Sequence, residues 1–453
     1  MIKILKLTLF IIFYIYQTSA ISKTVVKDDF NHKYLSNYLS GLISQNNQQT
    51  QKSVKYFNSS KLLNKHHEKF LKEYTISLVL DGQIKKSISL IKQNQNKSNS
   101  NFFEARLLLL IDNFKKGNFS QNISLLSEME KYRDNDTYSY IIYEVLNRYN
   151  NLFLNKELNL NNNRNLGNLS LINEAFEYCY LNKKDTNSKF NKLIKSKDGD
   201  YSRYLFFYLS NLIENNEYSK AVQISNSINI LDSNLLILQS KNWIDNSNFE
   251  KFKNFFSCEN ETDIIAEFFF IISNFLAVDK SFEESNFYSN ISNYLNPKFY
   301  FNLTHLLSNY YENNNFKKTK RILKSFSEKD KIYYWFKLKK IAQIIENEKG
   351  SEQSLSYIEE KFKSYSKPSV KIIFDMANIY KRSKEYEKSI KYYSEVLEKL
   401  DINSTEYGDV LYNRGASYER LGDDKNSDRD LLKSLTIKPD DPYILNYLGY
   451  SWL

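Results

Sequence analysis

Glycine and proline are scarce in this chain of 453 residues, which has only 10 Gly and 4 Pro. Sheet proteins with many tight turns need both residues at special backbone angles, whereas long helices joined by short polar turns need far fewer. The composition therefore favours an all-α fold. Hydrophobic residues make up 42% of the chain and aromatic residues 15%. These fractions can build a substantial core, which excludes wholesale disorder.

Charge of one sign is not concentrated anywhere, although the formal net charge is +10. A basic balance can indicate nucleic acid, an anionic membrane surface or acidic partners. Here the lysines are spread along the chain and alternate with Glu and Asp. We therefore expect a solvated basic surface and no nucleic-acid partner.

Long hydrophobic runs are missing from the chain after its first twenty residues. No segment in that part reaches 18 consecutive apolar residues. The first twenty residues differ, because Lys3 and Lys6 precede the apolar run 7–16 and the small residues Thr18, Ser19 and Ala20 follow it. This layout predicts a signal peptide over residues 1–20, and hence an exported chain, in the periplasm of a Gram-negative bacterium, with no membrane span after cleavage. The alternative is an uncleaved segment that anchors the chain in the inner membrane.

Catalytic and metal-binding motifs are also missing. The sequence has no GxGxxG, no GxxxxGK[ST] and no GxSxG. His66 and His67 are adjacent and so point to different helix faces, unlike the two histidines of an HExxH pair. We expect no catalytic residue, no cofactor and no metal ion, and the chain is interpreted as a non-enzyme.

A repeated pattern is present and is clearest near the C-terminal end. With Gly408 counted as position 1, the small residues Gly415, Ser427 and Ser434 stand at positions 8, 20 and 27. The apolar residues Leu411, Tyr418 and Leu431 stand at positions 4, 11 and 24, and Pro439 stands at position 32. Positions 4, 8 and 11 share one helix face, and small residues at 8 and 20 let two helices approach closely. The pattern resembles the tetratricopeptide repeat, a helix pair of 34 residues.

The resemblance extends upstream with falling fidelity. Units begin near Val370 and, less clearly, near Ala266 and Asp200, while the register is lost over 100–195 and the Asn-rich stretch 150–168 predicts a long loop or a degenerate pair. We predict an all-α, right-handed superhelical solenoid of antiparallel helix pairs, degenerate in its N-terminal half. The predicted segments are the signal peptide 1–20, degenerate repeats 21–98, irregular helical repeats 99–199, degenerate repeats 200–365 and clear repeats 366–453.

The two cysteines, Cys179 and Cys258, lie 79 residues apart, more than two repeats. In a solenoid each repeat touches only its neighbours, and a disulfide spans at most about 7 Å between Cα atoms. We therefore expect no intramolecular disulfide.

The family resemblance also implies a peptide-binding groove, lined by the first helix of each unit. Carried over by position, the candidate groove residues are Lys371, Phe374, Asn378, Lys381, Arg382, Tyr412, Asn413, Glu419, Tyr443, Asn446 and Tyr450. Asn378 and Asn413 stand where some relatives clamp a terminal carboxylate, but Phe374 replaces the lysine of that clamp. The alternative interpretation is a merely solvated inner surface.

The functional hypothesis is an exported scaffold that binds protein or peptide segments and supports envelope assembly. The whole layout resembles exported tetratricopeptide proteins of alphaproteobacteria, and the unit begun at Pro442 stops at Leu453, which predicts a fragment of a longer protein. Two alternatives stay open: a membrane-tethered assembly factor for surface polysaccharide, and an accessory subunit of an envelope enzyme.

Overall fold

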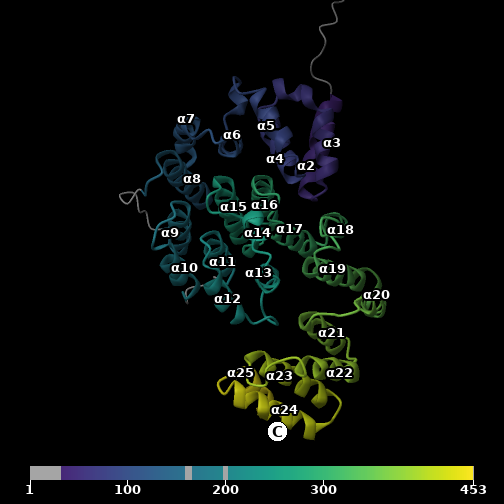
Figure 1. Cartoon of the computed structure of the whole chain (residues 1–453). Helices are drawn as coiled ribbons and strands as arrows, with labels where there is room; N and C mark the ends of the chain where they lie inside the picture. The colour runs from purple at the N-terminus through teal and green to yellow at the C-terminus, as the bar shows by residue number, and fades with distance from the viewer. Residues whose placement is uncertain (1–31, 159–165, 197–201, 452–453) are drawn as a thin grey trace, which may run out of the picture. The chain divides into compact units, whose positions relative to one another are not determined.

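The computed structural model describes residues 32–158, 166–196 and 202–451. Within these ranges the regular secondary structure is helical, without a strand, and consecutive helices pack in pairs (Figure 1). The predicted all-α fold of antiparallel helix pairs is therefore confirmed. The predicted signal peptide lies outside the described residues.

The chain divides into two compact units, residues 1–147 and 148–453. The partition does not test the segment boundaries given above, which stay predictions. The α-helices of the first unit are α2 (His32–Asn46), α3 (Thr50–Ser59), α4 (Phe70–Leu80), α5 (Ile84–Lys92), α6 (Phe103–Lys116) and α7 (Phe119–Met129). Helix α8 (Thr137–Asn155) contains the boundary.

The second unit continues with α9 (Asn168–Tyr180) and ends with α25 (Pro442–Ser451). Between them lie α10 (Thr186–Ile194), α11 (Tyr204–Glu214), α12 (Tyr218–Asn226), α13 (Leu235–Asp245), α14 (Glu250–Phe255), α15 (Glu261–Val278), α16 (Phe282–Leu295), α17 (Phe301–Glu312), α18 (Phe316–Leu323), α19 (Lys331–Lys349), α20 (Ser351–Lys363), α21 (Val370–Arg382), α22 (Tyr386–Leu397), α23 (Thr405–Arg420) and α24 (Asp424–Ile437). The sequence predicts a long loop or a degenerate helix pair over residues 150–168. Since α8 is helical to Asn155, the loop alternative is wrong in its first part.

A recurrent hydrogen bond explains why serine often replaces alanine at position 20. In four helix pairs a serine at this position donates to the backbone carbonyl twelve residues earlier, at position 8 of the facing helix. The four bonds join Ser53 to Gly41 (2.9 Å), Ser87 to Thr75 (3.1 Å), Ser285 to Ser273 (2.7 Å) and Ser354 to Ala342 (2.7 Å). A small hydroxyl keeps the helices close and still satisfies its own polar atom, as buried polar groups require.

The turn within each pair also recurs, with a residue at positive φ after the first helix. Gly422 has a φ of 75° and Lys384, fourteen residues after Val370, has a φ of 63°. Other such residues are Gln48, Gly82, Gly117, Asn182, Asn216, Ser247, Lys280 and Asn314. The left-handed conformation reverses the chain in about one residue, and glycine adopts it at the lowest cost.

Helix α15 of the second unit is buried along most of its length. Its Glu267, only 2% exposed, receives two hydrogen bonds from Arg203, at 2.8 and 2.5 Å. The Arg203 guanidinium also lies 3.8 Å from the centre of the Phe270 ring. Burial alone raises the pKa of Glu267, and the Arg203 charge opposes that rise. The pair therefore satisfies a carboxylate that would otherwise be buried alone.

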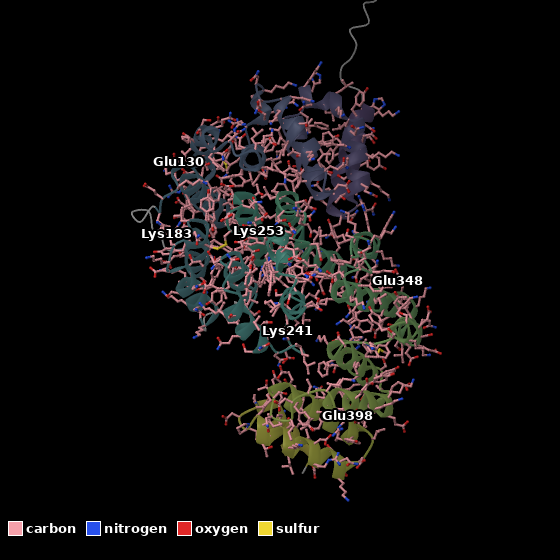
Figure 2. All side chains as sticks on the ribbon, viewed as in Figure 1. Glu130, Lys183, Lys241, Lys253, Glu348 and Glu398 are labelled. Atoms are coloured by element: carbon pink, nitrogen blue, oxygen red, sulfur yellow. A yellow bond between two sulfur atoms is a disulfide. The ribbon has the colours of Figure 1, made fainter. Side chains whose placement is uncertain are left out.

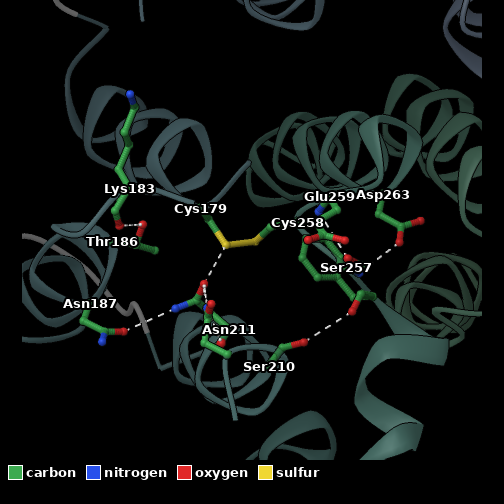
Figure 3. Close-up of a disulfide and its surroundings, with 12 residues drawn as sticks. Cys179, Lys183, Thr186, Asn187, Ser210, Asn211, Ser257, Cys258, Glu259 and Asp263 are labelled. Carbon is green, nitrogen blue, oxygen red and sulfur yellow. Dashed lines mark hydrogen bonds between the residues drawn. A yellow bond between two sulfur atoms is a disulfide. The ribbon is translucent and has the colours of Figure 1, made fainter. Parts of the chain in front are cut away.

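Cys179 and Cys258 form a disulfide with their Cα atoms 5.7 Å apart, so the prediction of no disulfide is wrong (Figure 3). The extended segment after α14 runs back across α11, where Ser210 Oγ donates to the Phe256 carbonyl at 3.3 Å. The Phe256 ring lies 5.8 Å from that of Phe176 on α9. The segment therefore brings Cys258 to a helix that is not its neighbour in the stack, which nearest-neighbour reasoning did not foresee.

Charged side chains of both signs cover the surface, as Figure 2 shows for Lys241, Glu348 and Glu398. Several lysines pair with carboxylates of an adjacent helix pair. Lys320 Nζ lies 2.8 Å from Glu348, and Lys388 Nζ lies 3.2 Å from Glu359. Within the described ranges, no helix has both the length and the hydrophobicity that a bilayer span requires.

Candidate functional site

The candidate groove lies on the first helices of the last three units, α21, α23 and α25. Each helix begins at a residue whose side chain accepts hydrogen bonds from the first turn. Ser369 accepts from the Ile372 amide, Ser404 from the Tyr407 amide, and Asp441 from the Tyr443 and Ile444 amides. Such N-caps satisfy amides that have no partner within the helix. The caps therefore fix where each helix starts and which residues share its groove face.

Lys381, Tyr412 and Asn413 come together between α21 and α23. Lys381 Nζ donates to Asn413 Oδ1 at 3.0 Å and lies 5.8 Å from the centre of the Tyr412 ring. Burial lowers the pKa of the Lys381 ammonium, and the nearby Arg420 charge lowers it further. A partly desolvated cation that is bonded to an amide and lies over an aromatic ring is suited to receive a carboxylate.

Tyr412 and Glu419 meet the last helix through a residue that the sequence interpretation missed, Tyr447. The Tyr412 and Tyr447 rings pack edge to face with their centres 5.8 Å apart. The Tyr447 hydroxyl donates to Glu419 Oε2 at 2.8 Å. Burial raises the pKa of Tyr447, and the Glu419 hydrogen bond and charge raise it further. Tyr447 is therefore a neutral donor that links α23 to α25. Its place at position 6 of its unit was the available signal.

Lys371 and Phe374 are turned toward other parts of the chain. Lys371 Nζ lies 3.2 Å from Asp375 Oδ1, and Asp375 also accepts from Lys339 Nζ at 2.7 Å. Burial alone would raise the pKa of Asp375, but the Lys339 and Lys371 charges hold it below its usual value. Phe374 is only 6% exposed and packs in a cluster with Leu231. Asp375 and Leu231 were both missed, and no local pattern points to Leu231.

Asn378 and Arg382 lie on the same helix, but their side chains differ in how firmly other residues hold them. Asn378 Oδ1 accepts from the Tyr393 hydroxyl at 2.6 Å, which ties it to α22. Arg382 is mostly exposed, with Glu346 at 3.8 Å as a solvated partner. Its guanidinium can therefore turn toward a ligand at little cost.

The last helix offers an open side to the groove. The side chain of Tyr443 is 73% exposed, and Asn446 is also exposed. The side chain of Tyr450 lies outside the described residues. An exposed tyrosine can pack against a peptide side chain at low entropic cost.

A separate cavity of about 820 Å³ lies in the second unit, away from the groove. Its floor includes the buried side chains of Gln239, Trp243 and Phe255, while Tyr300 donates to Asp330 at 2.6 Å. Lysines stand at its rim: Lys251, Lys298, Lys329 and Lys331. This rim can attract anions, and the sequence interpretation did not identify it.

Two segments, residues 370–398 and 408–441, match the tetratricopeptide repeat family. They coincide with the units that begin at Val370 and Gly408 and contain most of the candidate groove. A comparison with curated proteins finds no match.

Solved structures with similar helix arrangements include an APC/C hetero-tetramer, Cut9-Hcn1, at 13% identity and a TM-score of 0.31, over 92% of this chain and 96% of that chain. Another is yeast Tom70, at 13% identity and a TM-score of 0.33, over 92% of this chain and 94% of that chain. A third is the P58(IPK) TPR domain, at 11% identity and a TM-score of 0.22, over 92% and 97% of the two chains. At these scores the overlap supports no inference about function.

Proposed function

We propose that this chain is a non-enzymatic scaffold that holds an extended protein segment on the groove face of α21, α23 and α25. The observation that carries the proposal is the convergence of Lys381, Tyr412 and Asn413 from two adjacent units. Repeat units of this type present such a face to partners in many assemblies, and stacked helix pairs create extended binding surfaces.

The groove chemistry favours a segment that carries carboxylates. Lys381 is bonded to an amide, Arg382 has only a solvated partner at 3.8 Å, and Arg420 lies 3.4 Å from Glu419 on its own helix. Arginine can bind a carboxylate through two parallel hydrogen bonds. The exposed Tyr443 ring, at the start of α25, would cover an apolar side chain of the same segment.

We also propose that the scaffold is exported and serves envelope assembly, as in the alphaproteobacterial proteins that it resembles. Two independent features support export. The N-terminal residues have the layout of a signal peptide, and the second unit contains a buried disulfide. Disulfides persist mainly in oxidising compartments.

Crosslinking followed by affinity capture from the native cell tests the binding face. Lys381→Ala combined with Tyr443→Ala removes a central cation and an exposed ring, and we expect it to lose the partners captured by the unaltered chain. The matched control is Lys391→Ala combined with Ile402→Ala, which removes an exposed cation and an exposed hydrophobic residue outside the first helices. Equal capture by both double variants would contradict the assignment of this face.

Cell fractionation tests export. A chain that starts at Ile21 and is recovered with periplasmic proteins supports cleavage and release. An intact N-terminus in the membrane fraction would instead support the alternative of an anchored assembly factor, and recovery in the cytosol would contradict both.

A further inference from the structure

A short loop of the chain packs against two candidate groove residues of α21, Lys371 and Phe374. The loop joins α12 to α13 and spans residues 227–234. Its Leu231 is only 2% exposed and belongs to a buried cluster with residues of α21, α22 and α23: Ile373, Phe374, Ala377, Tyr393, Val396, Leu397, Val410 and Leu411. Ile230 packs against the same cluster. Leu231 and Ile373 are far apart in the sequence, so this contact is tertiary.

Polar contacts fix the loop at the same place. Lys371 Nζ, at a candidate groove position, donates to the Leu231 backbone carbonyl at 2.5 Å. Asp232 lies near Asp409, at position 2 of the next unit. Burial raises the pKa of the Asp409 carboxyl, Lys438 lowers it, and the Asp232 charge adds to the rise. The loop therefore contacts the candidate groove residue Lys371, and its Asp232 repels the Asp409 carboxylate of the next unit.

The loop is shaped to present one side chain. Asn229 Oδ1 accepts from the Leu231 amide at 2.8 Å and from the Asp232 amide at 3.1 Å. Ser233 Oγ donates back to the Asn229 carbonyl. These bonds form an Asx-type turn that projects Leu231 into the cluster while its carbonyl faces Lys371. A bulky aliphatic side chain in a pocket, with its backbone carbonyl bonded by the protein, is how a groove binds a peptide.

We propose that residues 227–234 are an internal occupant of the groove, and that a partner segment with a bulky aliphatic side chain binds there by displacing them. The inference rests on the proposed function and sharpens it, because it names both the anchor chemistry and the competitor. The partner's aliphatic side chain takes the place of Leu231, and its carbonyl accepts from Lys371. A binding surface that is open only part of the time has its apparent affinity reduced by that fraction.

A peptide of the loop's own sequence tests the idea without a known partner. The probe is a dye-labelled Ser-Ile-Asn-Ile-Leu-Asp-Ser-Asn peptide, residues 227–234, titrated into the full chain. Leu231→Ala removes the internal anchor, and we expect the probe to bind this variant on the order of tenfold more tightly than the unaltered chain. A probe with alanine in place of its leucine should bind neither chain.

Leu323→Ala is the matched control, because Leu323 is equally buried but lies in a different cluster. It should leave probe affinity at the unaltered level. Equal probe affinity for the Leu231→Ala and unaltered chains would overturn the proposal, and so would failure of the probe to bind either. If Leu231→Ala does not fold, hydrogen exchange of the unaltered chain decides. Excess probe should speed exchange in residues 227–234, and unchanged protection would overturn displacement.

The outcome is separable from that of the proposed function. Native partners that are lost in the Lys381→Ala and Tyr443→Ala double variant, but captured equally by the Leu231→Ala and unaltered chains, would leave the scaffold standing and remove the internal competitor.

Discussion

Gly415 lies so close to Leu431 that a β-carbon added to it would stand 2.9 Å from the leucine Cγ. The same β-carbon would be 3.3 Å from the Ser427 carbonyl oxygen. Gly415 is on the first helix of its pair, and Leu431 and Ser427 are on the second. The distance between α23 and α24 therefore depends on the absence of a side chain at Gly415.

Gly415→Ala is expected to lower the free energy of unfolding by about 1–3 kcal/mol, because overpacking forces a backbone or rotamer shift. The control is Gly449→Ala on α25, where a β-carbon would meet nothing within 4 Å. There, alanine should be neutral or stabilising, since it favours helix by up to about 1 kcal/mol over glycine. Urea titrations of both variants would check this, and equal effects would contradict the packing argument.

The turn residues Lys384 and Gly422 occupy equivalent positions, with φ of 63° and 75°. A side chain in this conformation costs roughly 1–2 kcal/mol. Lys384→Gly should therefore raise the midpoint of thermal unfolding, and Gly422→Ala should lower it, although nothing lies within 4 Å of a β-carbon at Gly422. The two shifts should have opposite signs in matched melts. A loss of stability in Lys384→Gly would show that its lysine contributes more than its strain costs.

The disulfide between Cys179 and Cys258 closes a loop across three helix pairs. Its removal should cost about 4.5 kcal/mol by the chain-entropy relation for 79 residues. The unaltered chain should lose stability in a reductant, while the Cys179→Ser and Cys258→Ser double variant should unfold at one denaturant concentration with or without it. Thiol labelling of the unaltered chain after denaturation gives a second readout. Two reactive thiols before reduction would contradict the bond.

These residues also show what the sequence could and could not predict. The Gly415 contact was predictable, because the small residue it requires recurs at a fixed position of a 34-residue unit. The same spacing identified Lys381 and Asn413 as candidate groove residues, but their contact was not predicted. The pairing of Cys179 with Cys258 was not predictable, because it depends on a non-helical segment that crosses α11. Leu231 was missed for the same reason, since a tertiary contact of a loop leaves no local period.

Glu214 should make stability depend on pH. Burial raises its pKa to about 7, Ser257 lowers it, and the Glu259 charge raises it further. Between its unfolded value near 4.5 and about 7, the native state binds more protons than the unfolded state. The free energy of unfolding therefore falls through this window as pH rises. His305 affects the free energy of unfolding in an overlapping pH window with the opposite sign. Burial lowers its pKa to about 4, so its contribution to stability rises with pH between about 4 and 6.5.

The Glu214→Gln variant separates the pH-dependent contribution of Glu214 from the opposite contribution of His305. The variant keeps the shape of the side chain and has no proton to lose, so it should match the unaltered chain near pH 4.5. Above pH 7 it should be more stable, by at most about 3 kcal/mol for a shift of this size. The measurement is the difference between the two urea midpoints across pH 4.5 to 8, in which the His305 contribution cancels. A difference that is constant with pH would mean that Glu214 titrates as it does in the unfolded chain, and that its partly buried site is hydrated.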